Sequence, residues 1–196
     1  MARPCNFEPE QVAEGLLQTF WRRGYARTAI ADLTAATKLL PGSLYGAFGN
    51  KEAMFRIAVE RYQSYLRSAV RTPTRGLAGV LDLLDAVVRI TVDDPERRGC
   101  LVINAIPEAA SYSAETRQLL QDDLRGSQRI IRKRLAEAQR EAGVRVDVDA
   151  LAAAVFSAIV GIRVLGRAGQ TPAQLQAIAD GAKLLVQRYF ARAHTP

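Results

Sequence analysis

Histidine and cysteine are almost absent from this chain of 196 residues, which has one His and two Cys. A Cys/His zinc site needs several such ligands, so we expect no metal site. Cys5 and Cys100 do not make a disulfide framework. His194, close to the end of the chain, is the single imidazole that could serve as a general base. With no Gly-rich nucleotide loop and no Ser/His/Asp set either, we expect no enzyme activity and no cofactor.

Long apolar runs are also lacking. The longest, residues 150–162, has 13 residues and lies between Asp149 and Arg163, which makes it too short to cross a bilayer. Residues 1–8 contain no apolar signal region. These absences predict a protein of the reducing cytoplasm with no membrane partner.

A surplus of basic residues gives the chain a net charge of +7, which favours a polyanionic partner. The surplus is spread out, at +3 over residues 1–70 and +4 over the remainder. Charge alone therefore does not locate a binding face. One alternative to a specific DNA-binding protein is an architectural protein that packages DNA without sequence choice. The modest and evenly spread charge argues against that alternative.

Apolar residues recur at helical spacing throughout, without strand-like alternation or an internal repeat, so we expect an all-α fold of about nine helices. The first four helices are expected over 9–23, 29–37, 41–48 and 51–71, with Pro9 opening the first and Gly24 ending it. Thr28 is the expected N-cap of the second helix, and Asn50 that of the fourth.

A break at residues 72–74 indicates a boundary. We expect a first domain over 1–52, joined through the helix at 51–71 to a larger domain over 74–196. Helices of this second part are expected over 76–92, 100–110 and 114–142, with Ser113 capping the last of these. Two more should begin near Asp147 or Asp149 and near Thr171.

Residues 28–51 give two short helices joined by a tight turn, which is the shape of a helix-turn-helix. Around this element the chain resembles the tetracycline-repressor (TetR) family of bacterial regulators. The following residues, which have the order and spacing typical of that family, carry the resemblance: Phe20, Gly24, Tyr25, Thr28, Ile30, Gly42, Ser43, Leu44, Tyr45, Phe48, Lys51, Glu52 and Phe55.

The resemblance implies a repressor that binds a palindromic operator in double-stranded DNA as a homodimer and is released by a small-molecule effector. It also implies DNA contacts by Thr28, Ser43, Tyr45, Gly46 and Lys51. Pro41 and Gly42 join this set because they lie at a helix N-terminus, where free N–H groups favour a phosphate or a base acceptor. Lys38 is expected to contact a phosphate as well. The alternative is that these residues only pack a small three-helix unit.

Three positions depart from the family pattern. Lys38 stands where the family often has Gly, Leu40 where it often has a Ser cap, and Ala47 where it often has a polar or aromatic residue. Gly46 and Ala47 offer little side chain for reading bases. We therefore expect recognition through backbone, DNA shape and apolar contact with thymine methyl groups.

The segment 97–105 resembles the Gly-Cys-Leu segment of a TetR subgroup in which some members sense electrophiles through the cysteine. Two arginines and a helix N-terminus could stabilise a Cys100 thiolate. The alternative, a small buried core residue, is favoured by the apolar residues at 101–103. Asn104, Tyr112 and Phe156 complete the candidate effector pocket by residue type and region, although ordinary core or surface roles are the alternative for each.

The last two helices are the expected dimer surface. Small residues between 153 and 161 would allow close helix approach, and an apolar seam of Leu175, Ile178, Ala182, Leu185 and Tyr189 would complete a four-helix bundle. The alternative is that both helices pack only within the monomer. We expect the Arg-rich part of residues 125–140 to be a solvated helix face.

Overall fold

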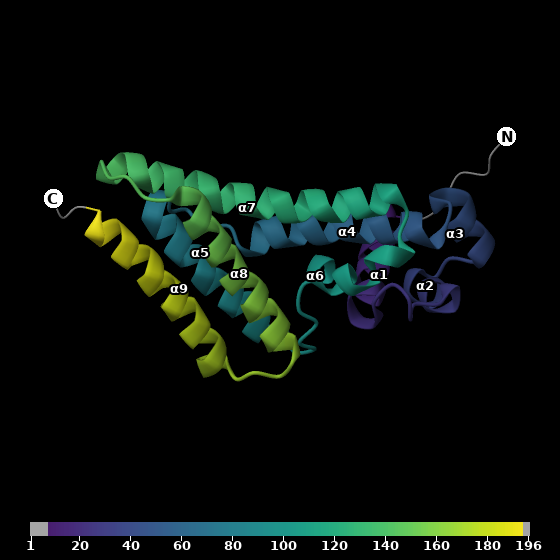
Figure 1. Ribbon diagram of the computed structural model, residues 1–196. Helices are drawn as coiled ribbons and strands as arrows, with labels where there is room; N and C mark the ends of the chain where they lie inside the picture. Colours follow the sequence, from purple (N-terminus) through teal and green to yellow (C-terminus); the bar gives the residue numbers. More distant parts are fainter. Residues whose placement is uncertain (1–7, 194–196) are drawn as a thin grey trace.

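The computed structural model describes residues 8–193, which form helices and connecting loops without a strand. Cys5 and His194 lie outside the described residues. Within residues 8–193 the prediction of an all-α fold with about nine helices is confirmed by nine α-helices (Figure 1). The elements are α1 (Pro9–Arg23), α2 (Ile30–Thr37), α3 (Pro41–Phe48), α4 (Lys51–Ala69), α5 (Gly76–Val92), α6 (Leu101–Ala105), the 3-10 helix η1 (Ile106–Ser111), α7 (Ala114–Ala142), α8 (Val148–Arg167) and α9 (Pro172–Arg192).

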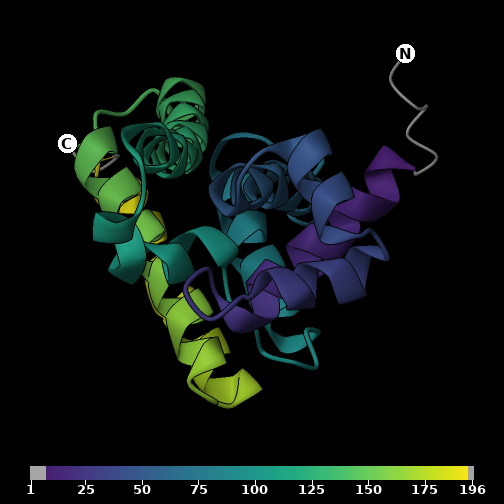
Figure 2. The same ribbon diagram turned by 90° about the vertical axis from the view of Figure 1, so that its right-hand side faces the viewer.

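The molecule is elongated, with α1, α2 and α3 at one end and α5, α8 and α9 at the other (Figure 1). We call the first end the head; Figure 2 views the molecule from that side. The long helices α4 and α7 contact each other and run between the two ends. A change in the packing of α4 or α7 can therefore alter the positions of elements at both ends of the molecule.

Buried side chains form two core clusters. One joins α1–α4 to α6 and the first part of α7, and it includes Phe20, Phe55 and Tyr112. The other fills the space between α5, α7, α8 and α9 and includes Leu84, Ile131 and Val155. The head thus shares its core with residues 100–120, which are distant in the sequence.

Helix ends follow local side-chain chemistry, with one correction. Asn50 caps α4 as predicted, its Oδ1 accepting from the Ala53 N–H at 2.8 Å. Thr28 does not cap α2, because its hydroxyl donates to the Gly24 carbonyl at 2.6 Å and its side chain is buried. Instead Asp32 accepts from the Ala29 N–H at 2.8 Å, and α2 begins one residue later than predicted.

The helix predicted over 100–110 is divided into α6 and η1. Pro107 has no N–H to continue an α-helical ladder, so the chain tightens into a 3-10 helix there. The predicted fourth helix ends at Ala69, two residues earlier than expected. Neither shift changes the order of the elements.

Helix α8 is long and apolar enough to cross a membrane by length and composition alone, unlike the shorter run counted in the sequence. It contacts α5, α7 and α9, as a core helix of a bundle does. Val164 and Leu165, near the end of α8, are nevertheless exposed.

Candidate nucleic-acid interface and internal cavity

The helix-turn-helix consists of α2 and α3 joined through residues 38–40. Lys38 ends α2 in the left-handed conformation, with φ of 58° and ψ of 21°. A side chain there costs about 1–2 kcal/mol relative to a conformation that L-residues prefer. This explains physically why a glycine suits the position and why Lys38 is a departure.

Helix α3 is anchored by one face and open on the other. On its inner face Leu44 is fully buried and Phe48 is half-buried. The opposite face exposes most of the predicted DNA contacts: Pro41, Gly42, Ser43, Tyr45 and Gly46. A Cβ added to Gly42 or Gly46 would meet no atom within 4 Å, so this surface is smooth enough for a nucleic-acid backbone to come close.

Predicted anion-binding groups lie at the N-termini of α3 and α4. Leu40 makes no side-chain cap, so it leaves first-turn N–H groups of α3 without a side-chain partner. Lys51, the first residue of α4, places its Nζ 4.5 Å from the centroid of the Tyr25 ring. Burial lowers the pKa of Lys51, while the nearby carboxylates of Glu108 and Asp32 oppose that shift.

Thr28 lies apart from this exposed set. Its side chain is 1% exposed and its hydroxyl is directed to the Gly24 carbonyl. The structure therefore gives Thr28 a role in closing the turn between α1 and α2 rather than a surface for DNA.

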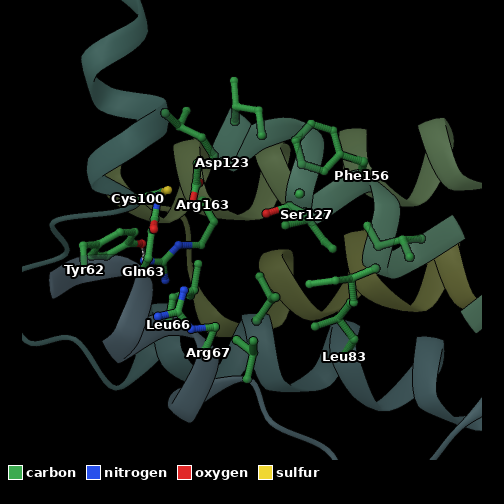
Figure 3. A pocket seen from close by; sticks show the side chains of 18 of the residues that line it. Tyr62, Gln63, Leu66, Arg67, Leu83, Cys100, Asp123, Ser127, Phe156 and Arg163 are labelled. Carbon is green, nitrogen blue, oxygen red and sulfur yellow. Dashed lines mark hydrogen bonds between the residues drawn. The ribbon is translucent and has the colours of Figure 1, made fainter. Parts of the chain in front are cut away.

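A cavity of about 520 Å³ lies among α4, α5, α6, α7 and α8. Two of the four predicted pocket residues, Cys100 and Phe156, line it (Figure 3). Asn104 does not, because its Nδ2 donates to the Arg98 carbonyl at 2.7 Å. Tyr112 does not either: its ring stacks on Phe55 with centroids 5.5 Å apart, inside the head cluster.

Arg163 of α8 also lines this cavity, and the sequence reasoning missed it. Its side chain donates to Thr91 Oγ1 at 2.9 Å, to the Tyr62 hydroxyl at 3.2 Å and to the Gly99 carbonyl. Burial raises the pKa of Tyr62 well above its ordinary value, so the hydroxyl stays protonated. The sequence feature that could have pointed to Arg163 is its position directly after the longest apolar run in the chain.

The loop between α5 and α6 connects the cavity wall to the head. Trp21 of α1 donates its indole N–H to the Gly99 carbonyl at 3.0 Å. Arg98 lies over the Trp21 ring, 3.9 Å from its centroid. Gly99 has φ of 71°, and a Cβ there would come within 3.1 Å of the Arg163 carbonyl, so a side chain at this position would be both strained and crowded.

Asp94 holds that loop in shape. Burial alone would raise the pKa of Asp94, but hydrogen bonds from the Arg98 side chain and backbone outweigh this and leave the pKa below its ordinary value. A second connection runs through η1 and the start of α7. Glu108 accepts from the Ala26 N–H at 2.9 Å, and Glu52 accepts from the Ser113 N–H at 2.7 Å.

Sequence models of known families match both parts of the chain. The model of the tetracyclin repressor-like C-terminal domain matches residues 76–182, more than half of the chain, and that of bacterial regulatory proteins of the tetR family matches residues 14–57. The chain belongs to the TetR family. It is a DNA-binding transcriptional regulator of that family, and its named relatives are regulators rather than enzymes.

Individual TetR-family relatives are similar over nearly the whole chain. The transcriptional repressor ComR of Escherichia coli K12 is 26% identical over 187 residues, which cover 90% of this chain and 88% of ComR. A CifR cysteine mutant, solved in complex with double-strand operator DNA, is 29% identical with a TM-score of 0.80, covering 92% of this chain and 98% of CifR. A TetR regulator from Chloroflexus aurantiacus, at 23% identity and a TM-score of 0.79, shows the shared fold.

Proposed function

We propose that this TetR-family protein is a repressor that binds a palindromic operator as a homodimer and releases it when a small molecule fills the cavity. The observation that carries the proposal is the Gly99 carbonyl, which accepts from Trp21 of the head and from Arg163 of the cavity wall. A ligand that favours another arrangement of this wall would shift the head relative to the body, and so change the fit to DNA.

The DNA surface we propose is the exposed face of α3 with the lysines beside it. Tyr45, Ser43 and the smooth positions Gly42 and Gly46 would face the major groove, with Pro41 at the helix start. Lys38 and Lys51 would contact phosphates. We leave Thr28 out because it is buried. We also propose that residues 1–52 are the DNA-binding domain and 74–196 the effector and dimerisation domain, with α4 linking them.

Exposed apolar side chains on α8 and α9 support the dimer. They are Val164, Leu165, Leu184, Leu185 and Tyr189. The predicted α9 seam divides: Leu175 and Ala182 are buried within the monomer, whereas Leu185 and Tyr189 are exposed. A second copy would cover this face and bring two heads to successive major grooves.

Leu185→Glu is expected to weaken the dimer. The side chain is 39% exposed, so the monomer should still fold, but each copy would place a charge in the shared surface. We expect the dimer dissociation constant to rise at least about 30-fold, measured by size-exclusion chromatography with light scattering. Ile106→Glu, at a site 46% exposed on η1, is the control and should stay dimeric. The opposite pattern would refute this dimer surface.

Separately from a ligand that binds reversibly in the cavity, we propose a covalent route of release, in which an electrophile reacts with Cys100. Cys100 is a free thiol that lines the cavity, and the chain presents it at the start of α6. If electrophiles act there, Cys100→Ser should abolish operator release by an electrophile such as N-ethylmaleimide, as measured by fluorescence anisotropy of labelled duplex. Unchanged release by the serine variant would exclude this route.

The proposed function is tested by selecting bound sequences from a pool of random duplexes. We expect an inverted repeat to be enriched and to bind much more tightly than random DNA, with an affinity that falls as salt rises. Equal binding to all duplexes would instead identify a DNA-packaging protein.

A further inference from the structure

Arg163 is a buried charge without an opposite charge. Its residue is 4% exposed, yet it makes no ion pair with any carboxylate between residues 8 and 193. Its three hydrogen-bond acceptors are two hydroxyls and a carbonyl, and its Nε is buried without an acceptor. A buried guanidinium held only by neutral groups is costly, and a carboxylate would stabilise it more strongly.

The cavity around Arg163 is apolar with an excess of positive charge. Its walls include Leu83, Val87, Ile131, Phe156 and Ile159. Four arginines line it, Arg67, Arg71, Arg134 and Arg163, against two aspartates, Asp122 and Asp123. Figure 3 shows the Arg163 side chain extending toward Tyr62, with Phe156 at a distance from that end.

Asp123 is a partly buried carboxyl in this lining, and it makes no ion pair with Arg163. Burial raises the pKa of Asp123, whereas Gln63, by a hydrogen bond, and the charge of Arg67 oppose the shift. Its charge is thus disfavoured by its surroundings, and the groups that stabilise it are on α4. The Arg163 end of the cavity keeps its positive charge available for a ligand.

We propose that the effector is a hydrophobic carboxylate whose chain fills the apolar cavity and whose head group pairs with Arg163. The inference rests on the proposed function and specifies its ligand. The cavity volume of about 520 Å³ lies within the range of small-molecule sites. The carboxylate replaces neutral acceptors of the guanidinium, the Gly99 carbonyl among them.

That replacement links the ligand to the head. The Gly99 carbonyl accepts from both Arg163 and the Trp21 indole, so withdrawal of the guanidinium removes the bond that ties this carbonyl to the cavity wall and leaves its bond to the head. The α5–α6 loop and α1 then settle into a different spacing. Trp21 is a positioning residue in this scheme, because it transmits the change without touching the ligand.

Decanoate and decan-1-ol form a matched pair of probes, since they differ at the head group and share the chain. Both are titrated into the wild-type protein by calorimetry, below the concentration at which decanoate forms micelles. We expect decanoate to bind about 10- to 100-fold more tightly than the alcohol. In Arg163→Gln the preference for decanoate should disappear. Equal affinity of the two probes for the wild-type protein would overturn the proposal, whether or not Arg163→Gln folds.

Operator anisotropy distinguishes this inference from the proposed function. If both probes released the protein from the operator and bound it with equal affinity, the cavity would remain the effector site and the preference for a carboxylate would be rejected. Tight binding of decanoate that leaves operator affinity unchanged would uphold the ligand class and reject the effector role.

Trp21→Phe tests the route from the ligand to the head, because it keeps an aromatic ring but removes the indole N–H. Decanoate should still bind this variant within about threefold, while its effect on operator affinity falls at least about fivefold. An unchanged effect would reject the Gly99 route.

Discussion

Gly46→Glu should reduce operator affinity at least about 100-fold in the dimer, because each copy would direct a negative charge at the phosphates. Nothing lies within 4 Å of a Cβ at this position, so the substitution does not disturb the packing of α3. Replacing a helical glycine should even stabilise the fold by up to about 1 kcal/mol. The affinity is measured by anisotropy on the selected duplex, and the stability by urea denaturation.

Two controls separate charge from shape in this experiment. Gly46→Ala adds a methyl group without charge and should cost less than about tenfold in affinity. Ala78→Glu adds the same charge to an exposed position of α5, far along the chain from the head, and should change affinity less than about threefold. If Ala78→Glu weakened binding as much as Gly46→Glu, α3 would not be the recognition surface.

Phe55→Ala should destabilise the protein by about 3–5 kcal/mol. Phe55 is fully buried at the centre of an aromatic group, with its ring centroid 5.3 Å from those of Phe20 and Tyr25 and 5.5 Å from that of Tyr112. Removing the ring leaves a cavity where the head meets η1 and α7. We therefore expect a lower urea midpoint and, in the folded fraction, weaker operator binding.

The conservative variant Phe55→Leu fills most of the same space and should cost less than about 2 kcal/mol. Both variants are compared with the wild type at one protein concentration, since dimer stability depends on it. A loss below about 1 kcal/mol in Phe55→Ala would show that the aromatic group does not hold the head to the rest of the molecule.

Most of the fold could be predicted from short stretches of sequence. Pro9, Pro41 and Asn50 start helices through chemistry within a few residues, and the structure has these starts where the sequence placed them. The Thr28 prediction was wrong because the hydroxyl, which as a cap would accept from an N–H of α2, instead donates to the Gly24 carbonyl. A residue type that suits a cap does not say which neighbour it will contact.

The cavity was less predictable because its lining comes from five helices. Cys100 and Phe156 were placed in it by type and region, whereas Tyr112 turned out to pack on Phe55, which is far away in sequence. Arg163 was used only as the end of an apolar run. That it is buried with neutral partners depends on Tyr62, Thr91 and Gly99, whose meeting no local pattern reveals.

A hydroxyl-radical footprint of the protein on its selected duplex tests most directly whether two copies of α3 recognise an operator. We expect two protected half-sites with dyad symmetry, centred about one helical turn or a multiple of it apart. Gly46→Glu should lose both protected regions together. Uniform protection along the duplex, or a footprint that Gly46→Glu leaves intact, would contradict operator recognition by α3.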